Sequence, residues 1–133
     1  MIVSPFESLT ELCKRLTAAT EAGQVKWSAA QEAVFLWAGI GGSVSVSSRD
    51  GDGEEPYALD VFNAAGLKVD TVGSEWVGEE QQPAPWNDPM ARLYRAARRQ
   101  ALGGDQIVKD LLAELALADL PLVSVKAASP STR

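Results

Sequence analysis

The stretch VFLWAGIGGSVSVSSRDGDGEEPYALDVFNAAGLKVDTV, residues Val34–Val72, contains three or four short apolar runs separated by glycine-rich or polar turns. Apolar and polar residues alternate in VSVSS, YALDVF and LKVDTV, and they alternate less cleanly in FLWAGI. A period of two residues is typical of a β-strand with one buried and one solvated face. The stretch therefore predicts an antiparallel β-meander of three or four strands.

The run around VSVSS has the clearest one-sided pattern. The pair Gly41-Gly42 predicts a two-residue hairpin turn before it. We expect Val44 and Val46 to face the core, and Ser43, Ser45 and Ser47 to face outward. An edge strand such as Val44–Ser48 could pair with its own copy across a two-fold axis, so a homodimer is a second expectation.

Helical patterns flank the meander on both sides. Ser4-Pro5 begins a first helix that ends at Gly23, and Asn87-Asp88-Pro89 caps a second helix that ends at Gly103-Gly104. Asp105 begins a third helix with a broad apolar face, and the short glycine link predicts an αα-hairpin.

A sheet with one apolar face must be covered by other elements. We therefore predict one α+β domain over residues 1–120, an antiparallel three- to four-stranded β-meander packed by an N-terminal helix and a C-terminal αα-hairpin. The small, polar residues 121–133 predict a disordered tail.

Composition limits the class of protein. The chain has 133 residues, the size of one ordinary domain, and its apolar runs are far shorter than a membrane span. The first residues include Glu7 and Glu11 and have no basic signal-peptide region, so we expect a cytoplasmic protein. Cys13 is the only cysteine and falls on or beside the apolar stripe of the first helix, which favours an inert core thiol over a reactive one.

Several catalytic classes are excluded by residue type. The chain has no histidine, so it cannot form a Ser-His-Asp unit, a Cys-His unit or a histidine metal site. The loop Asp50–Glu55 resembles the start of a calcium loop, but its twelfth position is Val61 instead of glutamate. We expect no metal and no cofactor. Paired carboxylates that act in general acid–base chemistry stay open, because spatial proximity is not visible in a sequence.

Charge is distributed unevenly along the chain. Residues 28–86 contain ten acidic and two basic residues, whereas residues 88–102 contain four arginines and one aspartate. Helical spacing puts Arg92, Arg95 and Arg99 on one face, with Arg98 beside them. This arginine ridge has three interpretations: surface ion pairs or a solvated helix face, a docking face for an acidic partner protein, or a nucleotide or RNA site with Tyr94 stacked on a base. The acidic chain as a whole disfavours nucleic acid.

The segment Gly73–Trp86 reads as a long loop, and long loops are often functional or mobile. It contains Trp76 and Trp86. These tryptophans either pack the loop against the body of the domain, which is the commoner use, or are exposed to bind a ligand.

Three further segments carry a family resemblance: G-x-V-K-W at the end of the first helix, YALDVFNAAGLKVDTV, and LYRAARRQALGGDQIVKDLLAEL. With this layout the chain resembles small bacterial proteins, some found near mobile elements, over roughly residues 9–117. The resemblance implies the helix, meander and helix-pair layout, and no catalytic residue.

These observations favour a non-catalytic interaction protein, a regulatory, immunity or adaptor factor of a bacterial system. We expect it to dock through Arg92, Arg95, Arg99 and the segment from Trp76 to Trp86. The alternative is a small-molecule or nucleotide binder, with or without enzymatic activity, whose site lies between that segment and the second helix.

Overall fold

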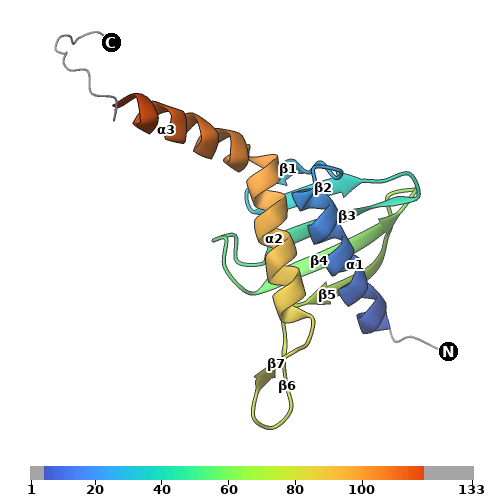
Figure 1. Ribbon diagram of the computed structural model, residues 1–133. Helices are drawn as coiled ribbons and strands as arrows, with labels where there is room; N and C mark the ends of the chain where they lie inside the picture. Colours follow the sequence, from blue (N-terminus) through green and yellow to red (C-terminus); the bar gives the residue numbers. More distant parts are fainter. Residues whose placement is uncertain (1–4, 119–133) are drawn as a thin grey trace. The chain divides into compact units, whose positions relative to one another are not determined.

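The structure is a computed structural model that describes residues 5–118, and the predicted tail at 121–133 lies outside them. The described residues divide into two compact units, one that ends at Leu102 and one that begins at Gly103. Figure 1 shows the elements of the first unit in chain order. They are α1 (Pro5–Glu21), β1 (Ser28–Gln31), β2 (Val34–Ala38), β3 (Gly42–Ser48), β4 (Tyr57–Asn63), β5 (Lys68–Gly73), β6 (Trp76–Val77), β7 (Gln82–Pro83) and α2 (Asn87–Ala101). The second unit contains α3 (Gly104–Ala118).

The predicted α+β layout with an antiparallel meander is confirmed, but the sheet has five strands and not three or four. Its order is β1-β2-β3-β4-β5, and every neighbouring pair is antiparallel. The additional strand is β1, whose sequence SAAQ shows no alternation and whose four residues are all exposed. It exists because β2 offers a free edge, with Ser28 opposite Leu36.

The prediction that Val44–Ser48 forms an edge strand is wrong. These residues belong to β3, which pairs with β2 on one side and β4 on the other. The edges of the sheet are β1 and β5. Any pairing of two copies through a sheet edge would therefore have to use one of those two strands.

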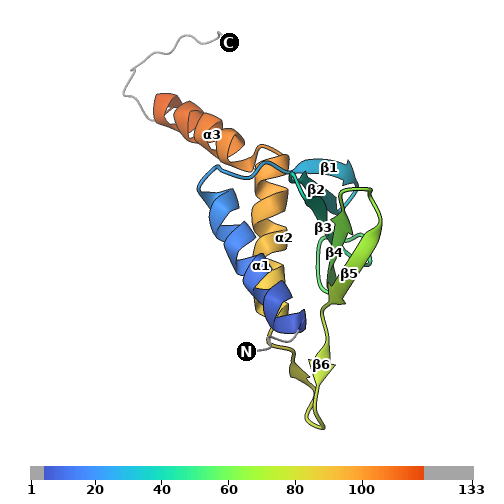
Figure 2. The same ribbon diagram turned by 90° about the vertical axis from the view of Figure 1, so that its right-hand side faces the viewer.

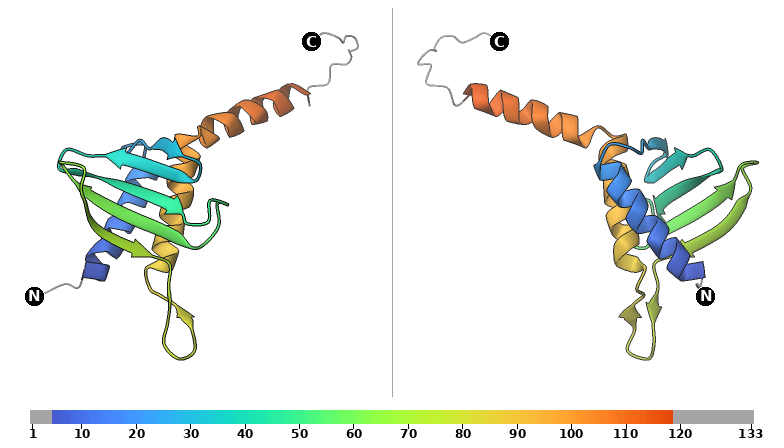
Figure 3. Two further views of the ribbon diagram at one scale, coloured as in Figure 1. Left: turned by 180° about the vertical axis from the view of Figure 1, so that it is seen from behind. Right: turned by 45° about the vertical axis from the view of Figure 1, so that its right-hand side comes forward.

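Helices α1 and α2 cover one face of the sheet and lie side by side on it (Figure 2). The view from behind shows the opposite face without a helix of the first unit in front of it (Figure 3). As predicted, Val44 and Val46 point into the core, together with Leu59 from β4 and Leu93 from α2. Ser45 lies on the opposite face but is nevertheless buried, because β3 is central and Leu36 and Asp60 flank it.

Helix α1 behaves as its sequence predicts. Leu9, Cys13 and Leu16 are buried against the core, and Gly23 ends the helix region with a φ of +79°. Burial raises the pKa of the Cys13 thiol to about 12. The cysteine is therefore an inert core residue.

The turn between β2 and β3 lies one residue earlier than predicted. The Gly39 N–H donates to the Gly42 carbonyl (2.8 Å), so Ile40 and Gly41 form the tip of the turn. Gly42 already pairs within the sheet, where a Cβ atom would collide with the Phe62 carbonyl oxygen. Position 42 therefore requires a glycine because of this close approach to Phe62, and not because of the turn.

Helix α3 forms the second unit, and none of its residues is buried. Ile107, Val108, Leu111, Leu112 and Leu115 are all exposed, from 40% for Val108 to 61% for Leu115. Within residues 5–118, no helix has both the length and the apolar character that a membrane crossing needs.

Candidate functional site

The four arginines of α2 are all exposed, as the helical spacing predicted. Arg92 donates through Nε to Asp88 Oδ2 (3.0 Å), and both side chains are largely in solvent. This pair lies within α2 and does not involve the acidic residues of the sheet. Arg98 lines a cavity of about 400 Å³, whereas Arg92 lines a smaller one of about 200 Å³ between α1 and α2.

The segment Gly73–Trp86 is more ordered than a loop. Strands β6 and β7 pair to form a small hairpin that projects beyond the end of β5 (Figures 1 and 3). Trp86 pins its base, because Nε1 donates to the Gly73 carbonyl (2.8 Å) and the ring packs against the core. Trp76 does not, since it is 45% exposed.

Asn87 was predicted to cap α2, but its side chain acts elsewhere. Its Nδ2 donates to the Glu75 carbonyl (2.7 Å), and its Oδ1 accepts from the Glu75 N–H (3.0 Å). The helix begins after Trp86 without a side-chain cap. Asn87 therefore closes the base of the β6–β7 hairpin.

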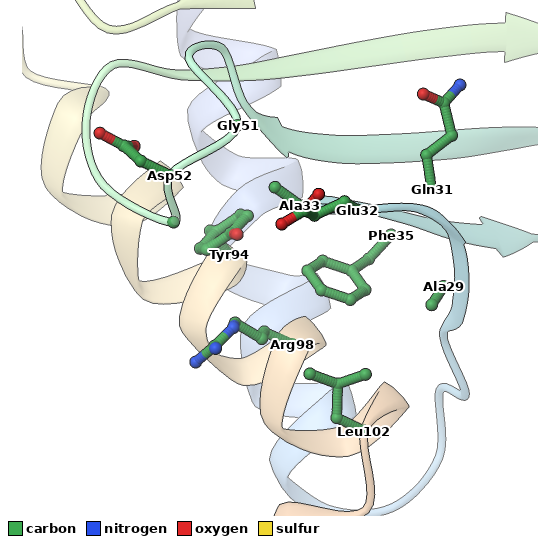
Figure 4. A pocket seen from close by; sticks show the side chains of 11 residues that line it. Ala29, Gln31, Glu32, Ala33, Phe35, Gly51, Asp52, Tyr94, Arg98 and Leu102 are labelled. Atoms are coloured by element: carbon green, nitrogen blue, oxygen red, sulfur yellow. The ribbon is translucent and has the colours of Figure 1, made fainter.

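A cavity of about 400 Å³ opens between three segments that are far apart in the sequence (Figure 4). One wall is the turn between β1 and β2, the second is the loop between β3 and β4, and the third is the C-terminal half of α2. The lining residues are Ala29, Gln31, Glu32, Ala33, Phe35, Gly51, Asp52, Gly53, Tyr94, Arg98 and Leu102. The size falls in the range of small-ligand sites.

Tyr94 lies at the base of this cavity and is 1% exposed. Its ring stacks on Tyr57 (centroids 4.6 Å apart) and meets Phe35 edge-on (5.6 Å). Among the described residues its hydroxyl has no hydrogen-bond partner. Burial raises the pKa of the Tyr94 phenol, and Asp52 and Glu54 raise it further although Arg98 lowers it. The hydroxyl is therefore protonated at neutral pH and can donate a hydrogen bond.

The loop between β3 and β4 is held in place by internal hydrogen bonds. The buried Ser48 hydroxyl lies 2.8 Å from the Glu54 carbonyl and 3.2 Å from Asp52 Oδ1, and it accepts from the Gly53 N–H (3.2 Å). The Tyr57 hydroxyl donates to the Gly53 carbonyl (3.2 Å). This wall of the cavity is therefore formed before any ligand arrives.

The opposite turn contains Ala33, which has a φ of +61°. This conformation is uncommon for a residue with a Cβ atom, and such residues concentrate at functional sites. The Ala33 carbonyl accepts from the Ser48 N–H (3.0 Å) and so links the turn to β3.

Sequence reasoning found the arginines but not this cavity. Tyr94 reads as one more residue of the apolar stripe of α2, and Arg98 as one more member of the ridge. The glycines of the Asp50–Glu55 loop were the only local signal, and they indicated an exposed turn. In the described range 5–118, no three acidic or cysteine side chains lie close enough together to hold a metal ion.

Comparisons of the chain with protein-family models, with curated proteins and with solved structures gave no match. What the protein can bind is therefore inferred from its own surfaces.

Proposed function

We propose that this chain is a non-catalytic interaction protein, a small regulatory, immunity or adaptor factor, that docks through α3. The observation that supports the proposal is the exposure of the apolar stripe of α3, defined as Ile107, Val108, Leu111, Leu112 and Leu115. Soluble proteins rarely leave so much contiguous apolar surface uncovered unless it binds a partner.

The shape of the stripe indicates the kind of partner. At 100° per residue the stripe spans about 140° of the helix circumference, wider than the seam of a two-stranded coiled coil. Helix α3 has 15 residues, or about two heptads, whereas a coiled coil needs roughly three or four. A groove that covers this apolar face of the helix fits this geometry better than a second copy of α3.

The charged residues of α3 indicate which charge the partner's groove carries. The helix carries Asp105, Asp110 and Glu114 against Lys109 alone. Acidic residues beside an apolar stripe favour a groove with a basic rim, since complementary rims orient the partners. We therefore propose a partner protein with an apolar, basic-rimmed groove.

The first test uses a photo-crosslinking amino acid in the full chain, expressed in the native host. Placed at Leu115, in the middle of the stripe, it should give an adduct with a second protein. Placed at Gln106, on the opposite side of the helix, it should give none. An adduct that contains only peptides of this chain would overturn the groove partner in favour of self-association, and no adduct at Leu115 would overturn docking through α3.

The second test measures affinity for the purified partner. Leu111→Ala should weaken binding about tenfold or more, since burying a leucine contributes about 1.5–3 kcal/mol. Leu117→Ala is the matched control, because Leu117 is also exposed (66%, against 51% for Leu111) but lies outside the stripe. Equal affinities of the two variants would contradict the proposal.

The arginine ridge is a second, separate docking proposal, for an acidic partner surface. Arg95 is exposed and, unlike Arg92, forms no salt bridge within residues 5–118. Arg95→Glu should weaken binding to that acidic partner at low salt and lose its effect at high salt. No change at low salt would remove the ridge from the interface.

A further inference from the structure

We propose that the cavity beside Tyr94 binds a small zwitterion of the amino-acid class. Its carboxylate would lie on Arg98 and the Tyr94 hydroxyl, its ammonium group would lie toward Glu32 and Asp52, and its apolar body would lie on Phe35. This inference is independent of docking through α3.

The first step rests on Tyr94. A buried hydroxyl without a partner destabilises a protein, and native structures rarely keep one unless it has a role. Tyr57, which stacks on Tyr94, and Phe35, which meets it edge-on, hold the Tyr94 ring in place. Figure 4 shows the Tyr94 hydroxyl within the ring of lining residues, and a Cβ atom added at Gly53 would lie 4.0 Å from it. A ligand atom that accepts a hydrogen bond would satisfy it.

The second step rests on Arg98, one helical turn after Tyr94. Its guanidinium forms no salt bridge in the part of the chain that the structure describes, and it is close enough to Tyr94 to lower the pKa of the phenol. A guanidinium and a neutral phenol hydroxyl together make a site for one carboxylate, which accepts hydrogen bonds from both.

The third step rests on Glu32, whose carboxylate lies in the turn between β1 and β2 that lines the cavity. Asp52 lines the cavity as well and adds negative charge, although its Oδ1 already accepts from the Glu54 N–H (2.9 Å). A nucleotide or another polyanion would be repelled by these two carboxylates, and a simple amine would leave Arg98 unmatched. A molecule that carries one negative and one positive group matches both sides. The cavity of about 400 Å³ has the volume of about a dozen waters, which suits a ligand with about a dozen non-hydrogen atoms.

Isothermal titration of the full chain tests the ligand class. L-leucine and L-phenylalanine are the first probes, and the best of the natural amino acids is then compared with its analogues. The amine without the carboxylate, the acid without the ammonium group and inorganic phosphate should each bind at least about tenfold more weakly. An analogue that binds equally well would overturn the zwitterion, as would the absence of heat with every amino acid.

A free amino acid and the terminal residue of a peptide share part of this chemistry. The N-acetylated amino acid keeps only the carboxylate, and the amino-acid amide keeps only the ammonium group. Both should bind at least about tenfold more weakly than the free amino acid. Equal binding of either one would overturn the proposal in favour of a peptide terminus.

Variants test the site itself. Arg98→Gln should weaken binding at least about tenfold, whereas Arg15→Gln, which changes an exposed arginine of α1, should leave it unchanged. Tyr94→Phe should also weaken binding, but the unliganded protein should become more stable, a combination that a purely structural role does not produce. An unchanged affinity in Arg98→Gln would overturn the site.

Discussion

Replacing Tyr94 by phenylalanine should stabilise the unliganded protein. The substitution removes only the hydroxyl, which is buried and has no partner among residues 5–118. The ring contacts with Tyr57 and Phe35 stay the same. An unsatisfied buried polar group costs about 1–3 kcal/mol. We expect a gain near the lower limit, about 1 kcal/mol, because the hydroxyl borders a cavity.

The neighbouring ring provides a matched control. The Tyr57 hydroxyl donates to the Gly53 carbonyl (3.2 Å), so Tyr57→Phe removes a hydrogen bond and should cost about 0.5–1.5 kcal/mol. The two substitutions are chemically identical and lie in stacked rings. We nevertheless expect them to change the free energy of unfolding in opposite directions.

Urea unfolding followed by tryptophan fluorescence measures both changes. A gain of about 1 kcal/mol raises the midpoint temperature of a domain of about 100 residues by roughly 4–8 °C, so thermal scans give a second readout. The m-values should stay equal, since neither substitution changes the surface exposed on unfolding. If Tyr94→Phe lowers stability as much as Tyr57→Phe does, the Tyr94 hydroxyl has a partner in solution and the reasoning is refuted.

Three further predictions concern residues outside the cavity. Trp86→Phe should lower the free energy of unfolding by about 1 kcal/mol, because it removes a partly buried hydrogen bond to the β5 backbone. Trp76→Phe should change it by less than about 0.5 kcal/mol, and equal losses in urea unfolding would contradict this. Arg92→Ala should leave the unfolding free energy within about 0.5 kcal/mol, because its ion pair is exposed, and a loss above about 1 kcal/mol would be inconsistent with that geometry. The pKa of Cys13 is raised from 9.0 to about 12 in the folded protein, so above pH 9 the unfolded chain releases a proton that the folded chain keeps, and the free energy of unfolding falls as pH rises. Between neutral pH and about pH 10, the wild type should lose about 1.4 kcal/mol more of its unfolding free energy than Cys13→Ala does. Parallel curves of unfolding free energy against pH for the two proteins would contradict the burial of the thiol.

Local patterns in the sequence determined most of the secondary structure. The alternation around Val44 and Val46 placed both side chains in the core, because a strand has a period of two residues whatever its neighbours are. The spacing of Met90, Leu93 and Ala97 likewise predicted the buried face of α2. The absence of histidine excluded whole catalytic classes without any coordinates.

Only the tertiary structure decided what depends on contacts between distant segments. Strand β1 forms because β2 offers it an edge, and β3 is central because strands pair on both sides of it; neither fact is written in SAAQ or VSVSS. In the sequence, Tyr94 looks like an ordinary member of the apolar stripe of α2, and Arg98 like one of the arginine ridge. Only the structure shows that the turn at Ala33 and the loop at Gly53 form a cavity with them. Periodicity reports which side of its own element a residue occupies, whereas a cavity depends on which other elements meet that side.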